Sequence, residues 1–106
     1  GDRDPGKRPL MGRAAERLAD RVVLTSDNPR NESPTAIIDA IRAGMASRPD
    51  IVEDRAEAIA AAVADADACD TILLAGKGHE PYQEIAGVRH PFSDAAVAAQ
   101  AVERRR

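Results

Sequence analysis

Short apolar runs alternate along this chain with longer segments that have the residue spacing of amphipathic helices. The runs Val22–Thr25 and Thr71–Ala75 are too short for helices and consist almost wholly of aliphatic and β-branched residues, which predicts strands buried on both faces. Strands that alternate with helices form mainly parallel sheets. The order of the segments therefore predicts an α/β fold in which helices flank a mainly parallel sheet.

Four helices are predicted from the apolar spacing and from residues that favour a helix start. Ser33, Asp54 and Ser93 are good N-cap residues, because their side chains can accept a hydrogen bond from a free backbone N–H. The predicted helices cover residues 9–19, 34–46 and 55–66 and the segment that follows Ser93.

The first predicted helix is amphipathic, because Leu10, Ala14 and Leu18 form an apolar stripe along it. Ile51–Val52 is a further candidate for a short strand. Near the C-terminus, two runs on either side of Ala86-Gly87 predict a β-hairpin, with strands over residues 82–85 and 88–90.

The start of the chain breaks the alternation, because a loop over residues 1–6 runs directly into a helix where a strand is expected first. We therefore expect an opening strand that precedes Gly1 and is absent from this sequence. The composition agrees: the chain is 43% hydrophobic, but 22 of those residues are Ala and only 22 are Val, Ile, Leu, Met or Phe. So thin a core predicts a single domain at most, with low stability on its own.

Charge and composition exclude several classes of protein. The net charge of −3 and the aromatic content of 2% argue against nucleic-acid binding. No apolar run reaches the roughly 20 residues of a membrane span. A single cysteine, Cys69, cannot form an internal disulfide. These features predict a cytoplasmic protein that binds neither nucleic acid nor membrane.

Polar and charged residues follow both predicted strands. In open α/β sheets, ligands bind at the carboxyl ends of the strands. The loops that begin at Asp27 and Gly76 should therefore meet at one edge of the sheet, together with the loop at residues 1–4. The mixed charge expected there suits a zwitterionic ligand; the residues concerned are Arg3, Asp4, Lys7, Asp27, Asn28, Arg30, Lys77, His79 and Glu80.

Simpler interpretations remain open for each motif. Gly76-x-Gly78 is not a dinucleotide fingerprint, because Pro81 stands where a third Gly should be, and the chain contains no P-loop. The two glycines could serve only a tight turn, and Asp27-Asn28-Pro29 could be a local Asx turn. His79 and His90 do not have the spacing of a zinc site, so no protein metal ligand is predicted.

Three motifs together are more specific. GDRDxGKRP at the start, DNPR from Asp27 and GKGHExYQ from Gly76 resemble, in this order and spacing, the C-terminal domain of the Mur ligases. DNPR resembles the signature of those members that take meso-2,6-diaminopimelate and not L-lysine. The resemblance covers nearly the whole chain, and it implies a Rossmann-like sheet that lacks its first strand.

The resemblance also implies an activity for the full-length protein. Residues 1–106 would be the amino-acid-binding domain of an ATP-dependent amide ligase of peptidoglycan synthesis. The ligase would add diaminopimelate to UDP-N-acetylmuramoyl-L-alanyl-D-glutamate through an acyl phosphate. An N-terminal UDP-binding domain and a central ATPase domain are absent from this sequence. The central domain would provide most of the binding site for ATP and Mg²⁺.

By motif position, the resemblance assigns the residues that would bind diaminopimelate. Arg30 and Asn28 would bind the distal carboxylate, because a guanidinium can grip a carboxylate with two hydrogen bonds. Asp4 and Lys7 would face the nucleotide, and no residue is assigned as catalytic. The full predicted substrate set is Arg3, Asp27, Asn28, Pro29, Arg30, Gly76 and Glu80.

Two alternatives remain at this point. The chain could be a stand-alone α/β module that binds a small anion or a nucleotide and has no ligase activity. It could also belong to a ligase that takes a different diamino acid.

Overall fold

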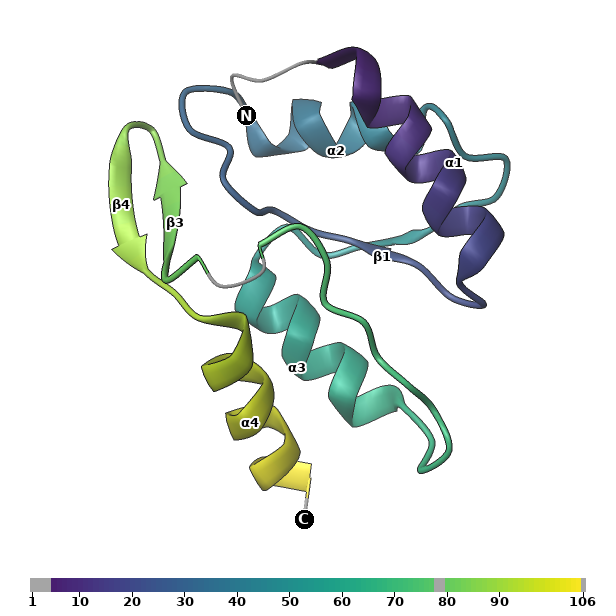
Figure 1. Ribbon diagram of the computed structural model, residues 1–106, viewed down its shortest axis with the longest axis vertical. Coiled ribbons are helices and arrows are strands. Elements are labelled where there is room, and N and C mark those ends of the chain that lie inside the picture. Colours follow the sequence, from purple (N-terminus) through teal and green to yellow (C-terminus); the bar gives the residue numbers. More distant parts are fainter. Residues whose placement is uncertain (1–4, 78–79, 106) are drawn as a thin grey trace.

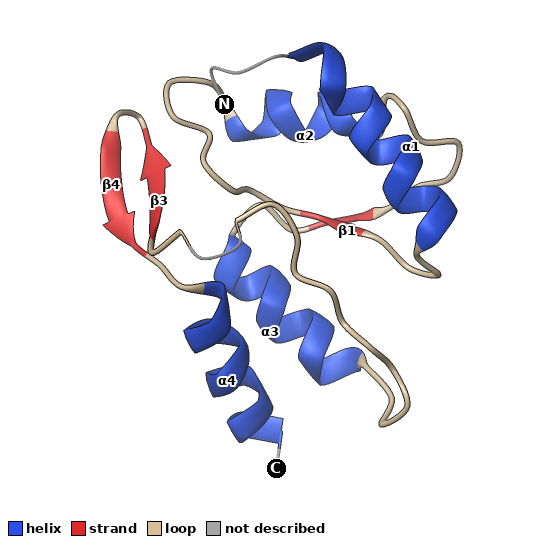
Figure 2. Ribbon diagram, viewed as in Figure 1, coloured by secondary structure: helices blue, strands red, loops and turns tan. Residues whose placement is uncertain are grey.

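The computed structural model describes residues 5–77 and 80–105. Two helices, α1 and α2, lie on one side of a short parallel strand pair, and α3 and α4 lie on the other side (Figure 1). A separate antiparallel hairpin stands beside them (Figure 2). The elements in chain order are η1 (Pro5–Lys7), α1 (Arg8–Leu18), β1 (Val23–Leu24), α2 (Pro34–Arg42), β2 (Asp50–Ile51), α3 (Arg55–Asp65), β3 (Tyr82–Ile85), β4 (Val88–Pro91) and α4 (Asp94–Arg105).

Three helices begin where the capping residues predict. The Ser33 hydroxyl accepts a hydrogen bond from the N–H of Ala36 at 3.4 Å, and the Asp54 carboxylate accepts one from the N–H of Glu57 at 3.0 Å. Ser93 caps α4 in the same way, at 3.2 Å. The predicted starts of α2, α3 and α4 are confirmed.

Helix α2 ends at Arg42, four residues before the predicted end at Ala46. A Cβ atom added at Gly44 would lie 1.9 Å from the carbonyl oxygen of Pro9, so only a glycine fits at this close approach. The chain turns away from α2 at this glycine because the start of α1 lies directly against it.

Helix α1 packs on α2 through a glycine and not through its apolar stripe. Gly12 is buried, and a Cβ atom there would lie 2.1 Å from the carbonyl oxygen of Ile41. Leu10 and Leu18 are 59% and 87% exposed, and Ala14 is exposed as well. The apolar stripe of this helix is therefore left uncovered by the described residues.

Strands β1 and β2 pair in parallel, with Val23 opposite Asp50 and Leu24 opposite Ile51. The parallel pairing confirms the α/β class, although β1 is shorter than predicted and β2 lies one residue earlier than predicted. The hairpin is confirmed as well: β3 and β4 are antiparallel around Ala86-Gly87, and both turn residues have the positive φ that such a tight turn requires.

The second predicted strand, Thr71–Ala75, is not a strand in the described chain. No described strand lies beside it to accept or donate backbone hydrogen bonds. Ile72 is 39% exposed and Leu73 is 85% exposed, whereas Leu74 packs against the core. The prediction of a buried strand is wrong here, and the parallel sheet among the described residues consists of β1 and β2 alone.

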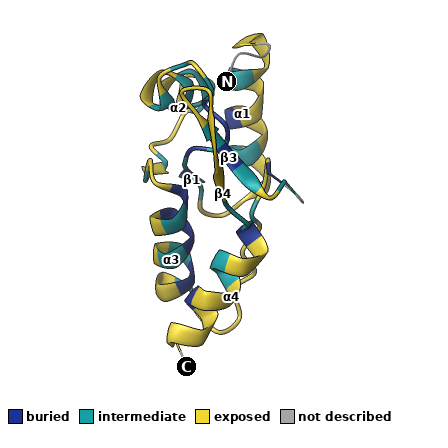
Figure 3. Ribbon diagram, turned by 90° about the vertical axis from the view of Figure 1, so that its left-hand side faces the viewer, coloured by how far each residue is buried: buried dark blue, intermediate teal, exposed yellow. Residues whose placement is uncertain are grey.

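The core is small and lies mainly between α3 and α4. Ile59, Val63 and Ala101 form its centre, and buried positions line the side of α3 that faces α4 (Figure 3). On the other side of β1, Ile38 of α2 is the main buried apolar residue. None of the described helices is long and apolar enough to cross a membrane.

Candidate functional site

The loops that follow β1 and residues 71–75 meet through an ion pair. The ammonium of Lys77 lies 2.9 Å from a carboxylate oxygen of Asp27. The side chain of Lys77 is completely buried, whereas that of Asp27 is 35% exposed. Gly76 adopts a φ of +100°, and a Cβ atom there would lie 3.5 Å from Asp27. The expectation that these two loops share one edge of the fold is therefore confirmed.

Asn28 joins the first loop to the second loop and to the hairpin. Its side-chain N–H donates to the Glu80 carboxylate at 3.2 Å, and its side-chain oxygen accepts from the backbone N–H of Glu84 at 2.8 Å. These two bonds span 52 and 56 residues of sequence, so Asn28 connects distant segments and does more than shape a local turn. Asn28 is only 5% exposed, which fixes the amide firmly.

The backbone around Arg30 is held by the edge of β3. The N–H of Arg30 donates to the carbonyl of Glu84 at 2.9 Å, and the N–H of Ala86 donates to the carbonyl of Arg30 at 2.5 Å. Arg30 has a φ of +55°, a left-handed conformation that costs a non-glycine residue roughly 1–2 kcal/mol. Together with the buried Pro29, these bonds set the position of Arg30 on the loop.

Lys77 has a structural partner set that sequence reasoning did not find. Besides the Asp27 pair, its ammonium donates to the carbonyl of Tyr82 at 2.5 Å and lies 5.9 Å from the centre of the Phe92 ring. In the sequence, Lys77 stands between two glycines and looks like a residue that binds a ligand. No pattern in the sequence indicates that its side chain is buried. Its charge is used to hold the loop of Asp27 against the start of the hairpin.

A second buried ion pair, Arg55 with Asp94, lies directly behind the same loops. The two side chains are 5% and 8% exposed, and two hydrogen bonds of 2.7 and 2.6 Å join them. The hydrogen bonds to Asp94 raise the pKa of Arg55 above its usual value, against the opposing effect of burial. Neither residue was predicted, because partners 39 residues apart leave no local pattern in the sequence.

Several predicted residues are not brought into this arrangement. Arg3 and Asp4, with His79, lie outside the described residues. Lys7 is exposed in η1 and forms no ion pair within the described part of the chain. Arg8, next to it, pairs with Glu32 at 2.7 Å and thereby ties the start of α1 to the segment that follows Arg30.

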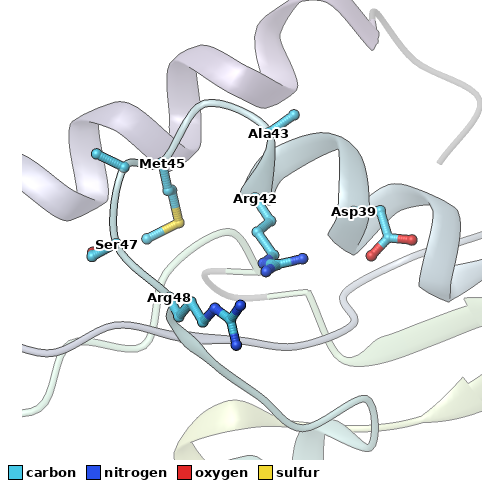
Figure 4. Close-up of a pocket in the computed structure, with 7 residues that line it drawn as sticks. Asp39, Arg42, Ala43, Met45, Ser47 and Arg48 are labelled. Atoms are coloured by element: carbon cyan, nitrogen blue, oxygen red, sulfur yellow. The ribbon is translucent and has the colours of Figure 1, made fainter.

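Two hollows of the surface lie elsewhere. One, of about 450 Å³, is lined by residues at and beyond the end of α2, and Arg42 and Arg48 extend toward it (Figure 4). A second hollow, of about 280 Å³, lies beside it. Neither includes any residue predicted to bind substrate. Among the described residues, no group of three His, Cys, Asp or Glu side chains could hold a metal ion.

The fold is that of a small α/β domain, in which charged loops follow β1 and residues 71–75. Comparisons with known proteins agree. The sequence profile described as "Mur ligase, glutamate ligase domain" matches residues 1–78. The chain therefore belongs to the Mur ligase family.

Individual relatives have more specific names. The chain is 60% identical over 103 residues to a UDP-N-acetylmuramoyl-L-alanyl-D-glutamate–2,6-diaminopimelate ligase of Chromobacterium violaceum. It is 61% identical over 105 residues to a ligase of the same name from Pseudomonas putida. Each alignment covers 96% of this chain but 21% of the relative, so the chain spans about a fifth of the length of these curated relatives.

A solved structure is also similar. It is a structure of a UDP-N-acetylmuramoyl-L-alanyl-D-glutamate–2,6-diaminopimelate ligase, which matches with a TM-score of 0.92 and 48% sequence identity. The match covers 98% of this chain and 22% of the solved chain. The described arrangement of helices, strand pair and hairpin is thus the arrangement of one part of a larger ligase.

Proposed function

We propose that this chain is the amino-acid-binding C-terminal domain of an ATP-dependent amide ligase, which adds meso-2,6-diaminopimelate to UDP-N-acetylmuramoyl-L-alanyl-D-glutamate in peptidoglycan synthesis. The observation that carries this proposal is the identity of about 60%, over 96% of the chain, with ligases of that name. The meeting of the loops that begin at Asp27 and Gly76 supports it, because it brings the loop of Asn28 and Arg30 next to the carboxylate of Glu80.

The chemistry of the distal end of diaminopimelate fits the contacts around Asn28. That end carries a carboxylate and an ammonium on the same carbon, so its site needs a donor group and an acceptor group side by side. Asn28 and the carboxylate of Glu80 are 3.2 Å apart, and Arg30 is two residues from Asn28. We assign the distal carboxylate to Arg30 and Asn28, and the distal ammonium to Glu80.

The remaining predicted residues complete this assignment. The carbonyl of Gly76 would be a second acceptor for the distal ammonium, and Arg3 would be a further carboxylate partner. One carboxylate oxygen of Asp27 pairs with Lys77. The Asp27 side chain is still 35% exposed, so a ligand could reach it. Pro29 is fully buried and would shape the loop, since almost none of its surface is accessible.

This arrangement would discriminate against lysine by an unpaired charge. L-Lysine lacks the distal carboxylate, so Arg30 would have no anion to bind when lysine occupies the site. A site built to hydrogen-bond a missing group rejects the analogue by about 10⁴-fold or more. Selection of diaminopimelate would therefore rest on Arg30 and Asn28 more than on the shape of the site.

ATP and Mg²⁺ would be bound mainly by other parts of the full-length ligase. The sequence contains no P-loop, and the described residues include no cluster of metal-ligating side chains. Of the two residues assigned to the nucleotide, Asp4 lies outside the described residues and Lys7 is exposed on η1. The part of this chain in the reaction would be mainly to hold the diamino acid.

We also propose that the parallel sheet is completed by a strand that precedes Gly1 in the full-length ligase. The backbone of residues 71–75 has no strand partner among the described residues, and Leu73 is 85% exposed. The exposed Leu10 and Leu18 of α1 supply further uncovered apolar surface, which a strand of aliphatic residues would match. The hydroxyl of Ser26, just beyond β1, is buried without a partner in the described chain. A further strand would extend the strand pair into a Rossmann-like sheet.

Substrate selection by the full-length ligase tests the proposed function. With ATP and the UDP-linked acceptor, the unchanged protein should form an amide with diaminopimelate and release phosphate, and should use L-lysine about 10⁴-fold less efficiently. Arg30→Asn should abolish most of this preference without unfolding the protein, because Asn tolerates the left-handed backbone at this position.

Arg48→Asn is the matched control, since Arg48 is exposed and belongs to none of the site loops. This control should retain the parental preference for diaminopimelate. The proposal fails if the unchanged protein forms no amide with diaminopimelate. Binding of a small anion or a nucleotide without amide formation would support a stand-alone binding module in its place.

A further inference from the structure

The guanidinium of Arg55 bridges the two loops that carry the candidate site. Its Nη1 donates to the carbonyl of Ser26 at 3.2 Å, and its Nη2 donates to the carbonyl of Ala75 at 3.1 Å. Ser26 directly precedes Asp27, and Ala75 directly precedes Gly76. One buried side chain on the first turn of α3 therefore holds the last residue before each loop.

Asp94 fixes this guanidinium from the opposite side. Its two carboxylate oxygens accept from Nε and Nη2 of Arg55 at 2.7 and 2.6 Å, in the paired geometry that suits an arginine fork. Asp94 is the first residue of α4, directly after the capping residue Ser93. The first turns of α3 and α4 are thus locked to each other and, through Arg55, to both loops.

The loops need such a connection, because no backbone hydrogen bond joins residues 71–76 to β1 in the described chain. Their other links run through side chains of the loops themselves, Lys77 with Asp27 and Asn28 with Glu80. Arg55 lies outside both loops and is buried behind them. Its position can therefore set the spacing of the loops whether or not ligand is present.

We infer that Arg55 and Asp94 are positioning residues for the diamino-acid site: they set the distance between the loop of Asp27–Arg30 and the segment of Gly76 and Lys77. This inference rests on the proposed function. A buried ion pair contributes little net stability compared with apolar residues of the same size, so stability alone does not account for it. A planar fork with donors on three nitrogens is suited to holding two carbonyls and a carboxylate in fixed places.

The test uses the full-length ligase and separates positioning from stability. Arg55→Lys keeps the charge but loses the fork, so KM for diaminopimelate should rise about 10- to 100-fold, since displacement of a site by about 1 Å can cost that much. KM for ATP should stay within roughly twofold of the parental value. Because KM does not depend on the fraction of folded enzyme, partial unfolding does not obscure this result.

Two further variants exclude a purely structural role. The double variant Arg55→Met with Asp94→Leu removes both charges together, so the thermal midpoint should equal or exceed that of Arg55→Lys while KM for diaminopimelate stays raised. Asp94→Glu keeps the pair but lengthens one side chain, and should raise the same KM to a smaller degree. Arg21→Lys is the matched control, because Arg21 pairs with Asp50 on the exposed surface.

The inference is overturned if Arg55→Lys and the double variant both show the parental KM for diaminopimelate, whatever their thermal midpoints. A uniform rise in KM for all three substrates would also overturn it, because the effect would then not be specific to this site. Failure of the unchanged ligase to use diaminopimelate would instead contradict the proposed function, so the two failures are distinguishable.

Discussion

Asn28 connects three segments of the candidate site. Its amide links the loop after β1 to Glu80 and to the backbone of β3. Asn28→Ala should leave the N–H of Glu84 and the carboxylate of Glu80 without this partner. We expect a loss of about 1 kcal/mol in the free energy of unfolding and a rise in KM for diaminopimelate of about tenfold.

Gln100→Ala serves as the control for this prediction, because it removes an exposed amide from α4. It should change neither quantity. An Asn28→Ala ligase with the parental KM would show that the amide does not organise the site, whatever the change in stability.

At the residue scale, the sequence predicted the polar residues of the two loops and missed the ion pair that supports them. Asp27, Asn28 and Glu80 stand in motifs that follow strand-like runs, so their meeting could be predicted from topology. The Arg55–Asp94 pair could not, because a buried ion pair depends on the packing of two helices that are distant in sequence.

One carboxylate helps to connect α1 with the segment before β2. Glu16 on α1 accepts from the backbone N–H groups of Ala46 and Ser47 at 3.0 and 2.7 Å, and also from the hydroxyl of Ser47. The Ser47 hydroxyl first, and then these two N–H groups, hold the pKa of Glu16 below its usual value of 4.5. The carboxylate thus accepts hydrogen bonds from two backbone N–H groups that lie beyond Arg42, where α2 has ended.

This lowered pKa gives a pH dependence of stability with a definite sign. A carboxyl whose pKa is lower in the folded state stabilises the fold above its unfolded pKa of 4.5, and loses that contribution as the pH falls through the folded value. The difference in thermal midpoint between the parental protein and Glu16→Gln should therefore be constant from neutral pH to about pH 5 and shrink below pH 4.5. Glu57→Gln, on the exposed surface of α3, is the control. A difference that grows on acidification would contradict this account.

At the scale of elements, helix starts were predicted better than helix ends and strands. Capping residues act locally, so Ser33, Asp54 and Ser93 marked three starts correctly. The end of α2 depends on the approach of Pro9 to Gly44, which is a tertiary contact. Residues 71–75 have the composition of a strand, but a strand also requires a neighbour.

At the scale of the whole molecule, apolar side chains are exposed where we propose a further strand of the sheet. Leu73 is 85% exposed in the described chain, so Leu73→Ala should change the stability of residues 1–106 very little. If the full-length ligase supplies the proposed strand, the same substitution there should cost about 2–5 kcal/mol, as for other buried leucines. Thermal unfolding of both proteins measures the difference.

Val88→Ala on β4 is the control, since Val88 is 56% exposed at the end of the hairpin and away from the strand pair. It should have a small effect in both proteins. Equal, small effects of both substitutions in the full-length ligase would contradict the proposed strand.

The fold class and the family could be predicted from the sequence. A chain of this length still shows the order of the three motifs and the alternation of strand-like runs with helical segments. The small size of the core could be predicted as well, because 22 large apolar residues limit how large a core can be in any arrangement. What did not follow is the burial of particular residues, such as Leu18 and Leu73, since this depends on which other segments are present.

The central claim, that these two loops bind diaminopimelate, is tested most directly by a crystal structure of the full-length ligase with that amino acid bound. The account predicts the distal carboxylate within about 3 Å of Arg30 and Asn28, and the distal ammonium at a similar distance from Glu80. Diaminopimelate bound with its distal end away from both Arg30 and Glu80 would contradict it.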